Sequence, residues 1–148
     1  MVQRIYMHFM VAFVSQEESQ ATLALAVHLA AATQSKLTLV KVLADPHSLG
    51  LVAELIATDE PFLLAKEELQ SVVDDLTQDD LNAVAEVRLV TEIGAGIVTA
   101  AIDLNVDMVF VGTGKPGGPS SFLMVNDPVA HYIVDHCPRS VVLVRQNE

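Results

Sequence analysis

Short apolar runs recur along the chain and are separated by polar or amphipathic intervals of helical length. The runs are about Ile5–Val14, Leu37–Leu43, Ala83–Thr91, Asp107–Gly112 and Ser140–Arg145. Strands that are apolar on both faces are typical of a parallel sheet covered by helices on both sides. The pattern therefore predicts an α/β fold with a doubly wound, five-stranded parallel sheet in the strand order 3-2-1-4-5 and helices on both faces.

The first interval has the strongest helical character. The segment Glu17–Thr33 is rich in Ala and Leu and contains neither Gly nor Pro. Ser15 and Glu18 have the spacing of a capping box, in which the Ser hydroxyl and the Glu carboxylate each accept a backbone N–H. We therefore expect this helix to begin at about Glu17.

The second interval divides into two parts. Ala44–Pro61 contains the breakers Asp45-Pro46 and Gly50, and it predicts an irregular, mobile segment with a short helical stretch at Leu51–Ala57. Apolar residues at helical spacing then predict a helix over Phe62–Leu76. We expect the irregular part to lie near the mouth of a pocket.

Two shorter helices complete the pattern. Gly94-Ala95-Gly96 is expected to separate the third strand from a helix over Ile97–Leu104, and a last helix is expected over Pro128–His136. Asp127 is a good N-cap residue for that last helix, and Pro is favoured at the first helical position.

Composition and charge limit the classes of function. Residues 1–148 suit a single domain, with 51% hydrophobic and 18% charged residues. The formal net charge of −11 repels nucleic acid and anionic lipid, and the apolar runs are too short for membrane insertion. The single cysteine, Cys137, excludes an internal disulfide and fits a reducing compartment, so a cytoplasmic location is expected.

Enzyme and metal signatures are weak. His131 and His136 are five residues apart, which does not place two ligands on one helix face. Cys137 precedes Pro138 and has no Cys-x-x-Cys partner, so structural burial explains it better than nucleophilic use. We expect no catalytic residue and no metal site.

The loop after the fourth strand is unusually rich in glycine. Residues 112–121 read Gly-Thr-Gly-Lys-Pro-Gly-Gly-Pro-Ser-Ser, and four of the seven glycines of the chain lie there. In a doubly wound sheet, ligands bind beyond the carboxyl ends of the strands, and such a loop can hold phosphate through backbone N–H groups. A flexible surface loop is an equally good interpretation, because the sequence matches no standard phosphate-binding motif.

The order of these segments resembles the universal stress protein family over nearly the whole chain. The resemblance is carried by Met10-Val11-Ala12-Phe13, by the second and fourth strands, and most specifically by residues 128–145, which end in His-Cys-Pro-Arg-Ser-Val-Val-Leu-Val-Arg. It implies a five-stranded sheet, homodimers formed through the last strand and, in one subclass, an ATP site with the pattern Gly-x-x-Gly-x9-Gly-Ser/Thr.

The resemblance also indicates that the nucleotide site is altered. Gly114-x-x-Gly117 and the following nine residues are present, but Asp127-Pro128 stands where Gly-Ser/Thr is expected. A carboxylate at Asp127 would repel phosphate, and Pro128 removes one N–H. Val14 stands where ATP-binding members have a carboxylate. If Gly112 is taken as the first glycine instead, the loop is two residues longer than usual.

We therefore expect a non-catalytic regulatory or stress-response protein that binds a protein partner or a small ligand other than ATP. It is expected to form a homodimer through Ser140–Arg145. The alternatives are a switch that binds ATP or AMP through the remodelled loop and a phosphoanhydride hydrolase or weak ATPase. Val42 and Val129 match apolar positions that flank nucleotide in the family, but a core role explains both better. The candidate pocket residues are Ala12, Val14, Val42, Gly112, Gly114, Lys115, Gly117, Asp127 and Val129.

Overall fold

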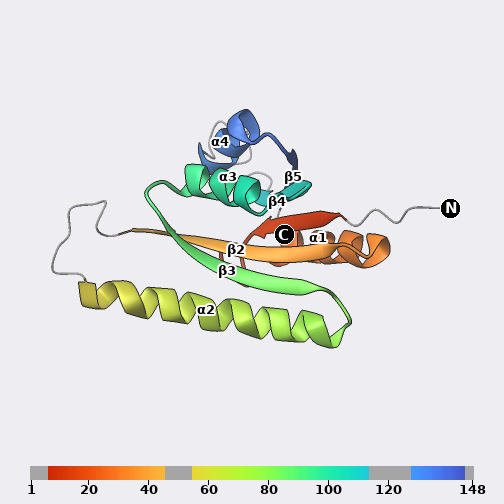
Figure 1. The fold of residues 1–148 in the computed structure, drawn as a ribbon, viewed down its shortest axis with the longest axis horizontal. Helices are drawn as coiled ribbons and strands as arrows, with labels where there is room; N and C mark the ends of the chain where they lie inside the picture. Colours follow the sequence, from red (N-terminus) through yellow and green to blue (C-terminus); the bar gives the residue numbers. More distant parts are fainter. Residues whose placement is uncertain (1–6, 46–54, 114–127, 146–148) are drawn as a thin grey trace.

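The computed structural model describes residues 7–45, 55–113 and 128–145, with the side chains of residues 55–59 left out of the description. The chain alternates strands and helices (Figure 1). The elements are β1 His8–Ala12, α1 Gln20–Thr33, β2 Lys36–Ala44, α2 Leu55–Gln78, β3 Ala83–Val90, α3 Ile93–Asp103, β4 Met108–Thr113, α4 Pro128–His136 and β5 Ser140–Arg145.

The five strands form one parallel sheet in the order β3-β2-β1-β4-β5, which confirms the predicted topology. The chain winds from β1 toward β3, then returns to the other side of β1 for β4 and β5. Winding therefore reverses between β1 and β4, and in such sheets this is the usual place for a ligand.

Helices cover both faces of the sheet, and the alternation of side chains along β1 shows the two layers. Phe9 and Val11 point into a core that also holds residues of α1 and α2. Met10 and Ala12 point into a second core with residues of α3 and α4. Apolar residues on both faces of one strand are the property that the sequence pattern predicted.

The strand boundaries agree with the prediction to within a few residues. The last strand coincides with the predicted Ser140–Arg145, and α4 coincides with the predicted Pro128–His136. β1 is shorter than predicted and covers only His8–Ala12. Asp127, the expected N-cap of α4, lies outside the described residues.

The start of α1 was predicted too early. Ser15 and Glu18 do interact, but they close a turn that precedes the helix, and α1 begins at Gln20. Ser19 stands at the N-cap position, yet its hydroxyl makes no cap hydrogen bond, because it accepts the N–H of Val14 at 2.8 Å. The capping-box residues therefore shape the connection from β1 to α1.

The helix α2 was predicted to start after Pro61, but it begins at Leu55 and includes this proline. Pro61 lacks the N–H that would continue the helical ladder. The helix continues because its next turns bury a stripe against the sheet, formed by Ala65, Leu69, Val72 and Val73. The predicted short helical stretch is thus confirmed for residues 55–57, the predicted irregular structure is wrong for residues 58–61, and residues 46–54 lie outside the described residues.

The start of α3 was also predicted too late, because Gly94 and Gly96 lie inside its first turns. A Cβ added at Gly96 would stand 2.5 Å from Cγ1 and 2.7 Å from Cβ of Val90. Glycine therefore lets this helix approach the end of β3 closely. Within the described ranges, no helix is long and apolar enough to cross a membrane.

Candidate functional site

A cavity of about 480 Å³ lies beyond the carboxyl ends of β1, β2 and β4, at the point where winding reverses. The ends of these strands form its floor, and the start of α3 and the start of α4 contribute side chains. Its lining consists of Ala12, Phe13, Val14, Val40, Lys41, Val42, Leu43, Ile93, Ile97, Val111, Gly112 and Val129. With the exception of Lys41, none of these residues has a polar side chain.

The structure brings five of the sequence-predicted site residues together in this cavity: Ala12, Val14, Val42, Gly112 and Val129. The other four, Gly114, Lys115, Gly117 and Asp127, lie outside the described residues. The described part of the predicted site is therefore a real cavity. Its chemistry is set by hydrocarbon side chains.

Gly112 has a packing role that the sequence did not reveal. It lies in β4, and a Cβ at this position would stand 2.7 Å from Oγ1 of Thr22, a buried residue of α1. The absence of a side chain therefore lets α1 lie close to the sheet beside the cavity.

Sequence reasoning missed three informative lining residues. Ile93 and Ile97 are four residues apart in α3, so both lie on the helix face that the cavity contacts. Their spacing was visible in the sequence, but the glycines between them were interpreted as a break. Lys41 was also visible, as the only charge inside the apolar run Leu37–Leu43.

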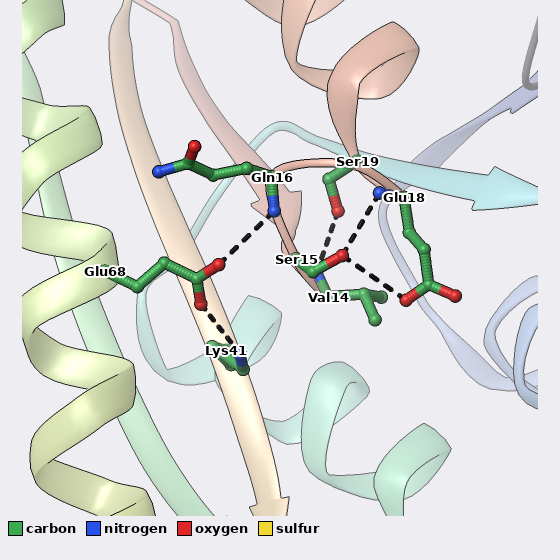
Figure 2. Close-up of polar contacts among 7 residues, drawn as sticks. All are labelled: Val14, Ser15, Gln16, Glu18, Ser19, Lys41 and Glu68. Atoms are coloured by element: carbon green, nitrogen blue, oxygen red, sulfur yellow. Dashed lines mark hydrogen bonds and ion pairs between the residues drawn. The ribbon is translucent and has the colours of Figure 1, made fainter.

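The connection from β1 to α1 forms one wall of the site and is closed by its own hydrogen bonds (Figure 2). Beyond Ala12, Phe13 still pairs with β2, since its N–H donates to the C=O of Val40 at 2.8 Å. The N–H of Val14 donates to Oγ of Ser19, a residue that is only 3% exposed.

The remainder of this turn is held in the same way. Oγ of Ser15 accepts the N–H of Glu18 at 3.1 Å and lies 3.5 Å from its carboxylate. The N–H of Ser19 donates to the C=O of Ser15 at 2.8 Å. The side chain of Val14, at the tip of β1, is left 56% exposed at the cavity.

A carboxylate from α2 fastens the turn to the sheet (Figure 2). Oε1 of Glu68 lies 2.9 Å from Nζ of Lys41, and Oε2 of the same residue accepts the N–H of Gln16 at 3.3 Å. The one cation at the cavity wall, within the described residues, is thus already neutralised by a partner.

This arrangement is poorly suited to a polyphosphate at the turn. The N–H groups of Val14, Gln16 and Glu18 all donate to side chains of the protein. The carboxylates of Glu18 and Glu68 lie beside them. A phosphate would have to displace these bonds and would meet like charge.

The histidines named as metal candidates have other roles. Nε2 of His131 lies 3.0 Å from the Asp135 carboxylate, and the ring of His136 stacks on Tyr132 with centroids 4.0 Å apart. In the part of the chain that is described, no three His, Cys, Asp or Glu side chains gather in a metal-binding arrangement.

Comparison with known proteins identifies the family. The model of the universal stress protein family matches residues 5–145. The chain belongs to the universal stress protein family. The resemblance given by residues 128–145 and by the strand pattern is thereby confirmed. No curated protein sequence matches the chain.

Solved universal stress proteins have the same fold at low sequence identity. UspA from Lactobacillus plantarum is 21% identical, with a TM-score of 0.70 and coverage of 95% of this chain and 98% of that chain. The universal stress protein from Archaeoglobus fulgidus in complex with dAMP is 17% identical, with a TM-score of 0.69 and coverage of 95% and 98%. A universal stress protein in complex with cAMP is 16% identical, with a TM-score of 0.61 and coverage of 94% and 96%.

Proposed function

We propose that this universal stress protein is a non-catalytic regulatory protein whose cavity binds a small, largely apolar ligand other than ATP. The observation that carries the proposal is the apolar lining of the cavity at the reversal point of the sheet. Burial of apolar ligand surface against such a wall is favourable by about 25 cal/mol per Å². A charged triphosphate gains nothing from this wall and loses its hydration.

The turn after β1, which forms another wall of the cavity, supports the same conclusion. The N–H groups of the turn after β1 are used within the protein, and Val14 presents a hydrocarbon side chain to the cavity. Lys41 is the only cationic group among the described lining residues, and Glu68 holds it. The ligand that fits best therefore has an apolar body and at most one anionic group, because Lys41 is paired with Glu68 and the described lining offers no other cation to a polyphosphate.

A titration with anilinonaphthalene sulfonate tests the proposal, because this fluorescent dye has an apolar body and one anionic group. We expect Val14→Asp to weaken dye binding about tenfold, since it places a carboxylate at the mouth of an apolar site. Leu63→Asp is the matched control. Leu63 lies on α2, away from the cavity lining, and is 56% exposed, as Val14 is.

The outcome is decided by the difference between the two variants. If Val14→Asp and Leu63→Asp weaken dye binding equally, or if neither weakens it, the dye does not bind in the cavity and the proposal loses its support. Mass spectrometry of small molecules released from denatured, freshly purified protein identifies the natural ligand class. A nucleotide released in equimolar amount would overturn the proposal.

A second candidate function is an adenine-nucleotide switch. The complexes of two related proteins with dAMP and cAMP favour it. Gly114, Lys115 and Gly117 would supply backbone amides and a cation to the nucleotide. Saturable AMP or ATP binding that is lost in Lys115→Ala supports this candidate, and phosphate release lost in the same variant supports a hydrolase.

We further propose that the protein is a homodimer through β5, and that this dimer presents its surface to a protein partner. β5 is an edge strand, and Leu143 on it is exposed. An apolar edge strand invites pairing with a second chain. Leu143→Glu is expected to increase the monomer fraction in sedimentation experiments, whereas a wild-type monomer at micromolar concentration would contradict the dimer.

A further inference from the structure

The opposite edge of the sheet is formed by β3, and among the described residues no strand pairs with its outer side. The C=O of Asn82 accepts the N–H of Leu37 at 2.9 Å, and the C=O of Val90 accepts the N–H of Asp45 at 2.7 Å. Because backbone groups alternate in direction along a parallel strand, the even-numbered residues of β3 face β2. The N–H and C=O groups of the odd-numbered residues 83, 85, 87 and 89 therefore point to the free edge.

The side chains of odd- and even-numbered residues of β3 lie on opposite faces of the sheet. Ala85 and Val87 pack against the core under α2, whereas Glu86 and Arg88 lie on the other face, where Arg88 reaches Asp103 of α3 at 2.8 Å. Within the strand, Nε of Arg88 lies 2.8 Å from the Glu86 carboxylate. Val84 and Leu89 are each 42% exposed. The edge thus combines exposed apolar groups with one acid and one base, two residues apart.

A groove runs along each face of β3. The groove on the α3 side measures about 670 Å³ and is lined by residues that include Arg88, Val90 and Glu92. The groove on the α2 side measures about 260 Å³ and is lined by residues that include Phe62, Ala85 and Val87. Glu86 lines both grooves. A strand added at the edge would place its alternating side chains over the two grooves in turn.

We propose that two copies of this chain pair antiparallel through β3, with the two-fold axis at Val87. In this register Glu86 of each copy lies opposite Arg88 of the other, and Val84 lies opposite Val90. The hydrogen-bonded pairs are Val87 with Val87 and Ala85 with Leu89, all of which have their backbone groups at the free edge. The charged residues then occupy the non-hydrogen-bonded pairs, where opposite side chains come closest.

Several symmetric registers would let the outward N–H and C=O groups of two β3 strands bond to each other. The charges of Glu86 and Arg88 favour the register with its axis at Val87. Moving the axis to residue 86 places Glu86 opposite Glu86, and moving it to residue 88 places Arg88 opposite Arg88. Like charges directly opposite in a strand pair are destabilising, whereas opposite charges stabilise the pair. The sequence Glu86-Val87-Arg88 is therefore self-complementary about its centre.

The β3 contact is independent of the ligand that the cavity holds, and it uses the edge opposite β5. If β5 also pairs, two isologous contacts at opposite edges would join dimers into larger assemblies. The formal charge of −11 on each chain opposes close approach, so the association is expected to depend strongly on protein and salt concentration.

Complementary charge variants test the pairing. Glu86→Arg alone makes every facing pair Arg with Arg, and Arg88→Glu alone makes every facing pair Glu with Glu. Each variant is expected to weaken self-association at least about tenfold, because two favourable pairs become two unfavourable ones. An equimolar mixture restores two Arg with Glu pairs, and native mass spectrometry should show the mixed species at wild-type levels.

Glu67→Arg is the matched control, because Glu67 is exposed on α2 and the substitution changes the charge equally. It should leave the β3 contact intact. Sedimentation of concentrated samples gives the association constants, and circular dichroism confirms that each variant is folded. If Arg88→Glu is unfolded, Leu89→Pro replaces it, because it removes an outward N–H and leaves the ladder to β2 in place.

Amide hydrogen exchange by nuclear magnetic resonance gives the second measurement. On concentrating the wild-type protein, the amides of residues 85, 87 and 89 should slow at least about tenfold, while those facing β2 are protected at all concentrations. The proposal is wrong if these three amides stay fast in a sample that associates, if association is absent, or if the mixed variants fail to associate.

Discussion

The most informative substitution is the removal of the carboxylate that joins α2, β2 and the turn after β1. Glu68 makes two contacts, one with Nζ of Lys41 at 2.9 Å and one with the N–H of Gln16 at 3.3 Å. The side chains of Lys41 and Glu68 are 20% and 26% exposed, so the pair is partly shielded from solvent. We expect Glu68→Ala to loosen the wall of the cavity as well as to destabilise the fold.

The expected cost follows from the degree of burial. Exposed ion pairs contribute up to about 1 kcal/mol, and breaking fully buried pairs costs about 3–5 kcal/mol. A pair with about a quarter of its side chains exposed lies between these limits, so Glu68→Ala should cost about 2 kcal/mol. In urea this lowers the unfolding midpoint by about 1 M, given slopes of about 1–3 kcal/mol per M.

A double-mutant cycle with Lys41→Met and Glu68→Gln isolates the ion pair. Met keeps the apolar stem of Lys41, and the Gln oxygen can still accept the N–H of Gln16. We expect a coupling free energy of about 1 kcal/mol from urea unfolding of the four proteins. A coupling near zero, or a Glu68→Ala protein as stable as wild type, would refute the view that this pair fastens the cavity wall.

Three further substitutions test the fold and its pH dependence. In a thermal unfolding assay, Gly96→Ala should destabilise the protein by about 1–3 kcal/mol, because its Cβ would stand 2.7 Å from Cβ of Val90. Gly94→Ala should cost less, because the nearest contacts of its Cβ would be 3.1–3.2 Å. Burial and the nearby Lys36 ammonium lower the pKa of His8. Stability should therefore fall as the pH drops below about 6.5 and through the pKa of the folded state, and His8→Gln should flatten this part of the stability curve.

The parallel sheet could be predicted because the strands are largely apolar and each crossover has helical length. Periodicity does not locate boundaries well where a glycine or a proline serves tertiary packing. Gly94 and Gly96 were interpreted as a break, but Gly96 lets α3 approach Val90. Pro61 was interpreted as the end of an irregular segment, but the stripe buried by the following turns keeps it inside α2.

The candidate site was predicted in part. Val14 and Val42 were named because they match positions beside the nucleotide in the universal stress protein family, and both lie at strand ends, where ligands bind in doubly wound sheets. The role of Glu68 could not be predicted, because it lies 27 residues after Lys41 and 52 after Gln16 in the sequence, and only the packing of α2 brings the three together. The predicted strand order already places β3 at an edge of the sheet, but the direction of its backbone groups and the grooves on its two faces are known only from the structure.

The central claim, that the cavity of this universal stress protein is not adapted to ATP, is tested most directly by calorimetric titration of the unmodified protein with ATP and magnesium. The claim predicts no saturable heat at ATP concentrations up to about 1 mM, which corresponds to a binding free energy weaker than about −4 kcal/mol. Saturable binding with a Kd below about 10 µM would contradict it.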